Sequence, residues 1–144
     1  MRLVVDTNIL FTYFWEKTFC RDVLDNEDIE FFAPILALRE IDKHKELIIK
    51  KANIPLMEFI AVRKEMASHI TFIDKRDCEK YYKEVKGYLK GLSKKDLGRI
   101  MKDIDFLAAA EMLCCPLCSN DKKIKKQEEI IVLNTGEIIE ILDN

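Results

Sequence analysis

The feature that most constrains the fold is a short apolar run near the start of the chain that ends abruptly in polar residues. Leu3-Val4-Val5 is followed by Asp6-Thr7-Asn8 and then by the apolar Ile9-Leu10-Phe11. An apolar, valine-containing run that gives way to residues favoured at helix starts predicts a buried parallel strand leading into a helix. A simpler interpretation is that Asp6-Thr7-Asn8 only caps that helix, because all three side chains favour the position.

The rest of the chain alternates strands with helices. We expect strands over residues 69–73, 116–119 and 130–133, and helices from Pro34 to about Lys51, from Pro55 onward, and over 77–89, 103–113 and 136–142. Residues 94–101 are expected to form a short helix or a loop. This alternation predicts an α/β fold in which helices sandwich a parallel sheet, with a charged, helix-rich segment over about 42–100.

The length and the charge balance limit the classes of protein to which this chain can belong. A chain of 144 residues fits one domain over 1–144. A net charge of −2, from 24 basic and 26 acidic residues, excludes a protein that holds nucleic acid by bulk charge alone. The same net charge is compatible with a local rim of basic residues around an acidic site. The four glycines form no Gly-x-Gly-x-x-Gly motif, which argues against a dinucleotide site.

Two features bear on location. No apolar stretch approaches the ~18 residues that a membrane span needs, and the N-terminus becomes acidic too soon for a signal peptide. We therefore expect a cytoplasmic protein. Heavy use of Lys and Glu, with Gln127 as the one glutamine, leans towards a thermophilic source.

The five cysteines do not indicate a disulfide framework in such a chain. Cys115-Pro116-Leu117-Cys118 has the spacing of a zinc half-site, but a structural zinc needs four ligands. The segment also fits a helix end that runs into a buried strand, where thiols behave as small apolar groups. Core packing is the favoured interpretation, and zinc or a disulfide stay open.

Several acidic residues that are far apart in the sequence are placed to converge. Asp6 and Asp121 each follow a predicted strand, Asp103 and Asp105 open an alanine-rich helix, and Glu40 lies in the first long helix. In an open α/β sheet, ligands bind beyond the carboxyl ends of the strands. Clustered carboxylates raise one another's pKa unless a cation lies between them, and oxygen-rich clusters suit Mg²⁺ or Mn²⁺. One or two such ions could support phosphodiester hydrolysis.

Four segments resemble the motifs of PIN-domain nucleases, and they occur in the same order. They are Val5-Asp6-Thr7-Asn8-Ile9-Leu10, Glu40, Asp103-Ile104-Asp105-Phe106-Leu107-Ala108-Ala109-Ala110, and Cys118-Ser119-Asn120-Asp121. The resemblance spans nearly the whole chain. It is strongest to archaeal stand-alone PIN proteins, which are similar to the toxin halves of VapBC pairs.

This resemblance implies a PIN-like (Rossmann-like) fold and an Mg²⁺- or Mn²⁺-dependent endoribonuclease that acts on single-stranded RNA and leaves 5′-phosphate and 3′-hydroxyl ends. It assigns metal binding and catalysis to Asp6, Glu40, Asp103 and Asp121, and an auxiliary metal role to Asp105. Asn8, Ser119 and Asn120 would hydrogen-bond the carboxylates. An antitoxin partner and a homodimer are further implications.

Cations near these acids could hold the phosphates of the substrate. The candidates are Lys122, Lys123, Lys125 and Lys126 after Asp121, Lys43 and Lys45 after Glu40, and Arg99 and Lys102 before Asp103. The lysines at 122–126 could instead form only a solvated face. His44, four residues after Glu40, could contact substrate or be an ordinary surface residue.

Aromatic residues follow the first strand, and they allow two interpretations. Bases could stack on Phe11, Tyr13 or Trp15. The favoured interpretation places Tyr13, Phe14, Trp15 and the pair at 31–32 in the core or at a subunit interface.

Two alternatives to the ribonuclease stay open. The first is a non-catalytic PIN-like scaffold or partner-binding subunit in RNA processing. The second is a DNA-structure nuclease related to flap endonucleases, for which 144 residues leave little room. Metal-dependent cleavage of single-stranded RNA, compared with branched DNA, separates the three.

Overall fold

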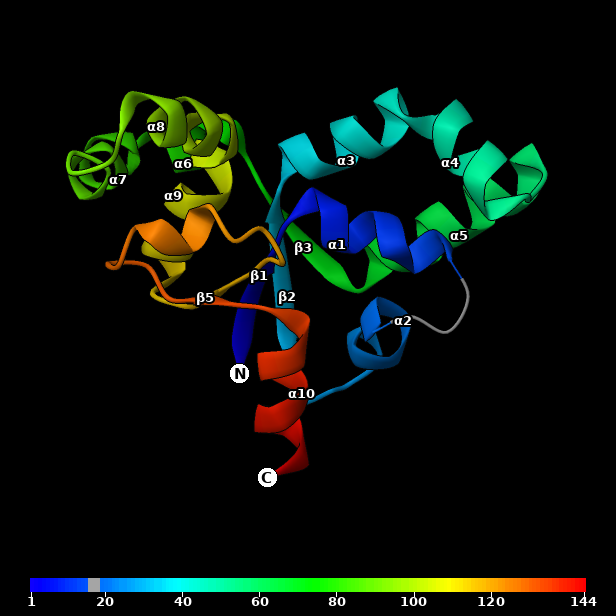
Figure 1. Cartoon of the computed structure of the whole chain (residues 1–144). Coiled ribbons are helices and arrows are strands. Elements are labelled where there is room, and N and C mark those ends of the chain that lie inside the picture. Colours follow the sequence, from blue (N-terminus) through cyan, green and yellow to red (C-terminus); the bar gives the residue numbers. More distant parts are fainter. Residues whose placement is uncertain (16–18) are drawn as a thin grey trace.

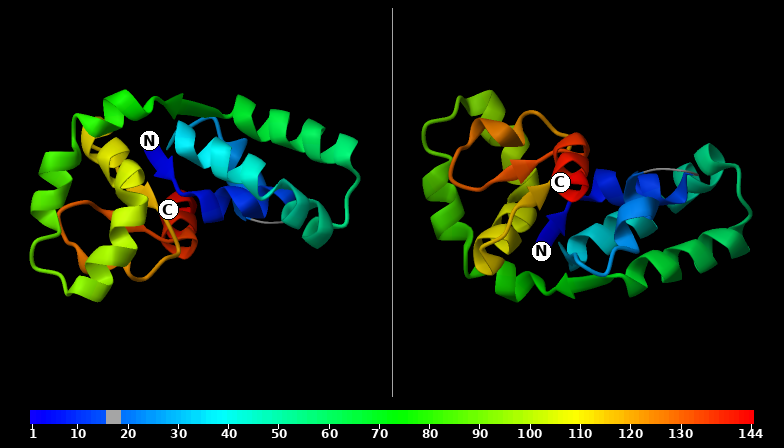
Figure 2. Two further views of the ribbon diagram at one scale, coloured as in Figure 1. Left: turned by 90° about the horizontal axis from the view of Figure 1, so that it is seen from above. Right: turned by 90° about the horizontal axis from the view of Figure 1, so that it is seen from below.

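The computed structural model describes residues 1–15 and 19–144. Its centre is one sheet of five parallel strands in the order β3-β2-β1-β4-β5 (Figure 1). The strands are β1 (Arg2–Val5), β2 (Glu30–Pro34), β3 (Ile70–Ile73), β4 (Leu117–Cys118) and β5 (Val132–Leu133). Helices lie on both sides of this sheet (Figure 2), so the expected sandwich is confirmed.

The helices fall into three stretches of chain. The first holds α1 (Thr7–Phe11), η1 (Thr12–Phe14) and α2 (Phe19–Leu24). The middle holds α3 (Ile35–Lys43), α4 (Lys45–Ala52), α5 (Leu56–Ser68), α6 (Lys75–Glu79), α7 (Tyr82–Tyr88) and α8 (Lys94–Ile100). The last holds η2 (Met101–Asp103), α9 (Ile104–Leu113), η3 (Ile124–Lys126) and α10 (Thr135–Asp143). No helix in the described ranges is long and apolar enough to cross a membrane.

The central strand β1 is buried because strands pair with it on both edges. Val4 is aligned with Phe32 of β2, and Val5 is aligned with Cys118 of β4. Leu3, Val4 and Val5 are at most 1% exposed, as expected for a strand covered on both faces. This register brings the carboxyl ends of β1 and β4 to the same level, where Asp6 and Ser119 follow them.

Helix α9 covers one face of the sheet. Its run from Phe106 to Ala110 is buried, and the helix packs against β1, β2 and β4. The three alanines let the backbone approach the sheet closely and favour the helical conformation. Because α9 is fixed in this way, its first residues are held at the carboxyl edge of the strands.

The sequence-based expectations were wrong about the segment before Pro34. Residues Glu30–Pro34 form strand β2, and the helix begins only at Ile35. Phe31 and Phe32 are buried in the core, as one of the two interpretations predicted. Pro34 is the last strand residue, and its extended backbone leads directly into α3.

Two expected helices are interrupted in the structure. The helix expected to run to about Lys51 is divided at His44 into α3 and α4. The helix expected over 77–89 is replaced by α6 and α7. In Figure 2, α3, α4 and α5 form an arm to one side of the sheet.

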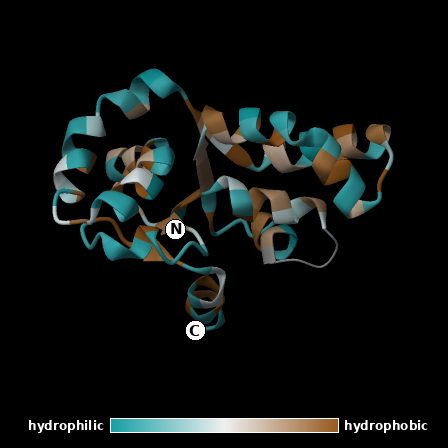
Figure 3. Cartoon of the chain, turned by 45° about the horizontal axis from the view of Figure 1, so that its top comes forward, coloured by the Kyte–Doolittle hydropathy of each residue, from teal (hydrophilic) through white to brown (hydrophobic). Residues whose placement is uncertain are grey.

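This arm carries apolar side chains at the surface. Leu47 is 65% exposed and Met57 is 74% exposed, and Leu56 and Ile60 are also exposed. Apolar colouring accordingly alternates with hydrophilic colouring along these helices (Figure 3).

Candidate active site

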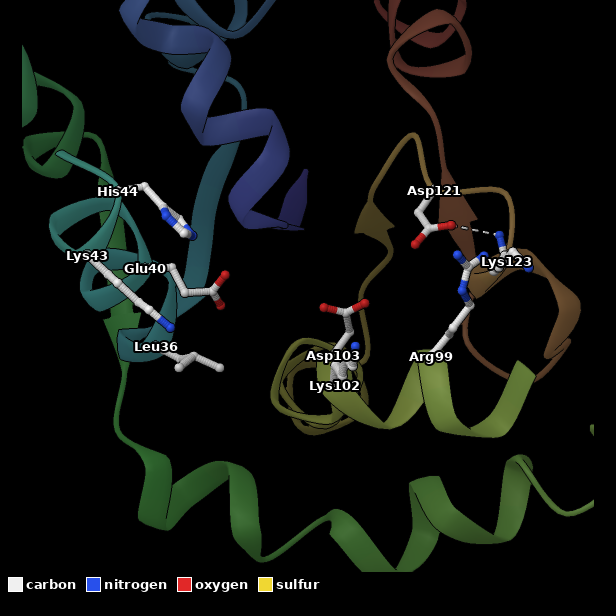
Figure 4. Close-up of a pocket in the computed structure, with 9 residues that line it drawn as sticks. All are labelled: Leu36, Glu40, Lys43, His44, Arg99, Lys102, Asp103, Asp121 and Lys123. Atoms are coloured by element: carbon white, nitrogen blue, oxygen red, sulfur yellow. Dashed lines mark hydrogen bonds between the residues drawn. The ribbon is translucent and has the colours of Figure 1, made fainter. Parts of the chain in front are cut away.

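An open pocket of about 680 Å³ lies at the carboxyl edge of the sheet. It is lined by Leu36, Glu40, Lys43, His44, Arg99, Lys102, Asp103, Asp121 and Lys123. Glu40 stands on one side, Asp103 and Asp121 stand on the other, and their carboxylates turn toward the space between them (Figure 4). Three of the four acids assigned from the sequence therefore share one pocket.

Asp6, the fourth acid, is buried beside this pocket at the junction of β1 and α1. Its backbone N–H donates to the Cys118 carbonyl at 3.2 Å, which continues the pairing of β1 with β4. One carboxylate oxygen accepts from the Ile9 N–H at 2.9 Å and so caps α1. The other oxygen accepts from the Ser119 hydroxyl. Asp6 thus caps helix α1, as one interpretation predicted, and it also lies beside the pocket.

Glu40 reaches the pocket from helix α3. Leu36, Glu40, Lys43 and His44 are spaced so that they fall on one side of a helix, and all four line the pocket. Ala37 and Ile41 lie on the buried side of the same helix and are 0% exposed. Burial raises the pKa of Glu40, as does the Asp6 carboxylate, while Thr7, His44 and Lys43 act against the rise.

Asp103 is the residue that precedes α9. It occupies the cap position, but its carboxylate makes no capping hydrogen bond. Burial, together with the nearby carboxylates of Asp6, Asp121 and Glu40, raises its pKa to about 6 against the opposing effect of Lys102. A half-buried, uncapped carboxyl group that three other carboxylates repel has an electrostatic environment that favours a nearby cation.

Asp121 lies on the loop after β4 and is held there by hydrogen bonds. Its N–H donates to the Ser119 hydroxyl at 3.1 Å, and its carboxylate accepts from the Lys123 N–H at 2.9 Å. Ser119, which is 0% exposed, therefore joins Asp121 to Asp6. Burial raises the pKa of Asp6, and Asp121 adds to that rise even though Ser119 and Ile9 oppose it.

The donor set suits a hard divalent cation. The four acids provide only oxygen ligands, and Mg²⁺ and Mn²⁺ prefer oxygen. Among the described residues, the Thr7 hydroxyl is the buried side-chain polar atom without a well-formed hydrogen bond. It lies close enough to Glu40 to lower the pKa of that carboxyl.

The acids do not form a ready-made coordination sphere. Within residues 1–15 and 19–144, no three His, Cys, Asp or Glu side chains converge closely enough to hold an ion. Mg²⁺ usually keeps several of its waters and binds proteins through only one or two carboxylates. The observed spread of the carboxylates is compatible with that mode of binding.

Four cations share the pocket with these acids, namely Lys43, Arg99, Lys102 and Lys123. Three of the lysines after Asp121 lie near acidic partners, and Lys123 also lines the pocket. Lys126 pairs with Asp96 at 2.9 Å, Lys125 pairs with Glu137, and Lys123 lies 3.8 Å from Asp96. Lys122 is exposed outside the pocket lining.

Three other residues named from the sequence lie away from the pocket. Asp105 is buried, and its carboxylate accepts from the Tyr82 hydroxyl. Asn120 accepts from the Thr135 N–H at 3.0 Å, which anchors the start of α10. Asn8 is exposed and makes no hydrogen bond to these carboxylates in the described part of the chain. Thr7 was not singled out from the sequence, although its place directly after Asp6 was the available signal.

The five cysteines are free thiols, so the disulfide alternative that the sequence left open for Cys115 and Cys118 is not formed. Cys118 is 0% exposed, and burial raises its pKa to about 12. Neither thiol belongs to a metal-binding group in the described ranges. The favoured interpretation of core packing agrees with the position of Cys118 in β4.

The aromatic residues after β1 differ in how deeply they are buried. Tyr13 and Phe14 are at most 4% exposed, and the Phe14 ring stacks on Phe59 with centroids 5.1 Å apart. Phe11 and Trp15 are only partly buried. His44 lines the pocket and makes an edge contact with Phe11.

A five-stranded parallel sheet with four acids gathered at its carboxyl edge defines a PIN-like α/β protein. The family model described as PIN domain matches residues 4–129. The chain therefore belongs to the PIN domain family, whose members are generally nucleases.

One solved structure shares the fold over almost the whole chain. It is the crystal structure of VapBC2 from Rickettsia felis bound to a DNA fragment from their promoter. The match has a TM-score of 0.65 and 19% identity, and it covers 93% of this chain and 98% of the other. No curated protein matches the chain.

Proposed function

We propose that the protein is a metal-dependent endoribonuclease that hydrolyses phosphodiester bonds of single-stranded RNA. The observation that carries the proposal is the gathering of Asp6, Glu40, Asp103 and Asp121 around one open, cation-rimmed pocket. Membership of the PIN domain family supports nuclease activity. Burial and repulsion from the neighbouring carboxylates raise the pKa of Asp103, and both are costs of the charged form that a bound cation would offset.

In this proposal Asp6, Asp103 and Asp121 hold one or two Mg²⁺ or Mn²⁺ ions. A bound ion would polarise the phosphodiester and lower the pKa of a water molecule. Glu40 orients the attacking water or contributes a further ligand. The water oxygen bonds to phosphorus, the bond from phosphorus to the 3′ oxygen breaks, and that oxygen gains a proton. The products carry a 5′-phosphate and a 3′-hydroxyl.

The cations at the rim supply the grip on the substrate. Lys43 and Lys102 are exposed, and Arg99 stands above the same pocket. Each can pair with a backbone phosphate on either side of the scissile bond. Lys123 lies near the Asp96 carboxylate, so a substrate phosphate would have to compete with Asp96 for it. An unpaired strand suits the open pocket better than a rigid duplex, because its backbone can follow an irregular surface.

Cleavage of a labelled, unstructured RNA tests the proposal. The chelator-treated protein should be inactive, and adding Mn²⁺ or Mg²⁺ should restore cutting. Asp6→Asn, Asp103→Asn and Asp121→Asn should each lower the rate by roughly 100-fold or more. The matched control is Asp143→Asn, at the exposed end of α10. For Glu40→Gln the control is Glu46→Gln, which is exposed and outside the pocket lining.

The alternatives predict other results in the same assay. A scaffold cuts no RNA with any metal. A DNA-structure nuclease cuts branched DNA faster than single-stranded RNA. Cleavage that continues at full rate in Asp6→Asn, or in the presence of chelator, would contradict the assignment.

We further propose that the protein is a cytoplasmic toxin, held inactive by an antitoxin, and that it forms a homodimer. The fold shared with VapBC2 supports the pairing with an antitoxin. Co-expression with the product of an adjoining reading frame should give a stable complex that no longer cuts RNA. Light scattering on the isolated protein should give twice the mass of one chain.

A further inference from the structure

A second, smaller pocket adjoins the candidate active site. It has a volume of about 190 Å³ and is lined by Phe11, Trp15, His44, Leu47, Ile48 and Lys51. His44 belongs to the lining of both pockets, and it stands beyond Glu40 along α3 in Figure 4. A ligand that extends past Glu40 therefore meets the smaller pocket next.

Aromatic rings and one cation dominate its walls. The Phe11 and His44 rings meet edge to face with centroids 5.8 Å apart. The Lys51 ammonium lies 4.8 Å from the centre of the Trp15 ring. Phe11 and Trp15 are only partly buried, whereas the neighbouring Tyr13 and Phe14 are enclosed in the core. Phe11 and Trp15 line this pocket, and Trp15 and Phe14 also line a neighbouring pocket of about 590 Å³.

A nucleobase is the ligand whose chemistry fits these walls. Its flat ring system stacks on aromatic side chains, and the phosphate beside it pairs with a cation such as Lys51. The small volume admits one ring system rather than the side of a helix. Covering Leu47, which is 65% exposed at this pocket, removes apolar surface from water.

We propose that this pocket binds one nucleobase of the RNA strand whose phosphate lies at Glu40 and Asp103. The proposal rests on the proposed function, because the strand must occupy the acidic pocket first. It adds a specificity element: the base next to the scissile phosphate is held by Phe11, Trp15 and His44.

Trp15 gives a direct readout, because the chain contains a single tryptophan. The probes are a short oligoadenylate and an abasic ribose-phosphate strand of equal length, added to Asp103→Asn protein with Mg²⁺. The oligoadenylate should quench the Trp15 emission and saturate, while the abasic strand should leave it unchanged. Equal quenching by both strands, or quenching by neither while both bind, would overturn the proposal.

Two matched variants test the pocket without depending on fluorescence. Leu47→Glu places a charge at the pocket, whereas Met57→Glu makes the same change at a 74% exposed residue of α5 outside it. We expect Leu47→Glu to weaken oligoadenylate binding at least fivefold and Met57→Glu to change it less than twofold. Phe11→Leu keeps an apolar side chain, removes the ring and should also weaken binding about fivefold.

The outcomes separate this inference from the proposed function. Metal-dependent RNA cleavage that is equally fast in Leu47→Glu, Phe11→Leu and wild-type protein overturns the base pocket and leaves the nuclease intact. Loss of all RNA binding and cleavage by wild-type protein overturns both. If Leu47→Glu changes the mass in light scattering but not the RNA affinity, the pocket contacts a second copy of the chain and the base proposal fails.

Discussion

The Ser119 hydroxyl donates a hydrogen bond to the Asp6 carboxylate across 113 positions of sequence. The Ser119 hydroxyl oxygen also accepts a hydrogen bond from the Asp121 N–H at 3.1 Å, so one buried side chain connects two of the four acids. The pairing of β1 with β4 makes this contact, because Val5 is aligned with Cys118 and the next residues meet. Ser119 thereby fixes where the Asp6 carboxylate points.

We expect Ser119→Ala to reduce metal affinity or cleavage by about 10- to 100-fold, because Asp6 loses the group that orients it. The loss of a buried hydrogen bond should also lower the free energy of unfolding by about 1–2 kcal/mol. Calorimetric titration of the chelator-treated protein with Mn²⁺ measures the metal affinity. Ser93→Ala is the matched control, since it removes the cap of α8 and should cost stability without changing metal affinity. Equal metal affinity in both variants would contradict the positioning role.

The electrostatics of Asp103 predict a pH dependence of stability. Its folded-state pKa is raised from 3.8 to about 6, so the folded protein holds this proton more tightly than the unfolded chain does. Stability contributed by the protonated form is therefore present below pH 3.8 and is lost as pH rises through about 6. Without metal, Asp103→Asn should be more stable than wild type above pH 6, by about 1–2 kcal/mol once solvent screening is allowed for. Urea unfolding at several pH values in chelator measures the difference.

A constant difference across the pH range would show that Asp103 has an ordinary pKa. Asp143→Asn, which changes an exposed carboxyl by the same substitution, should follow the wild-type curve. Adding Mg²⁺ should reverse the order, because a bound cation stabilises the wild-type protein and binds the variant less tightly.

The buried Asp105 offers a contrast with Asp103 two residues earlier. Its carboxylate accepts from Tyr82 on α7 and lies outside the pocket lining. We expect Asp105→Asn to retain cleavage within about twofold, because an amide oxygen can still accept from Tyr82. Tyr82→Phe should lower the free energy of unfolding by about 1–3 kcal/mol, since it leaves a buried carboxyl without its donor. Cleavage assays and urea unfolding measure the two effects. A loss of activity in Asp105→Asn as large as that in Asp103→Asn would instead support the auxiliary metal role.

The positions of three of the four acids could be predicted because each lies next to a local signal in the sequence. Asp6 and Asp121 come after apolar runs, and Asp103 precedes a run of alanines that favours a helix. The carboxyl ends of parallel strands meet at one edge, so local signals alone bring these residues together. The strand from Glu30 to Pro34 escaped prediction because it is short, continuous and ends in proline, which also favours a helix start.

The partners of the charged residues could not be predicted, because they depend on tertiary structure. Lys125 and Lys126 are adjacent in sequence, yet they pair with Glu137 and Asp96 on different elements. Asp103 and Asp105 differ by two positions, which places them on opposite sides of a helix. That spacing was available from the sequence, and it argues against a shared metal role for the two carboxyls.

The rim cations predict how RNA binding depends on salt. Lys102 lines the pocket and is exposed, with no ion pair among the described residues. Each phosphate contact that is lost should reduce the slope of log affinity against log salt concentration by about 0.7 for a single strand. We expect Lys102→Ala, measured with Asp103→Asn protein to prevent cutting, to show this reduction. Lys126→Ala removes a cation that already pairs with Asp96 at 2.9 Å, and it should leave the slope nearly unchanged. Equal slopes for all three proteins would place the RNA backbone away from this rim.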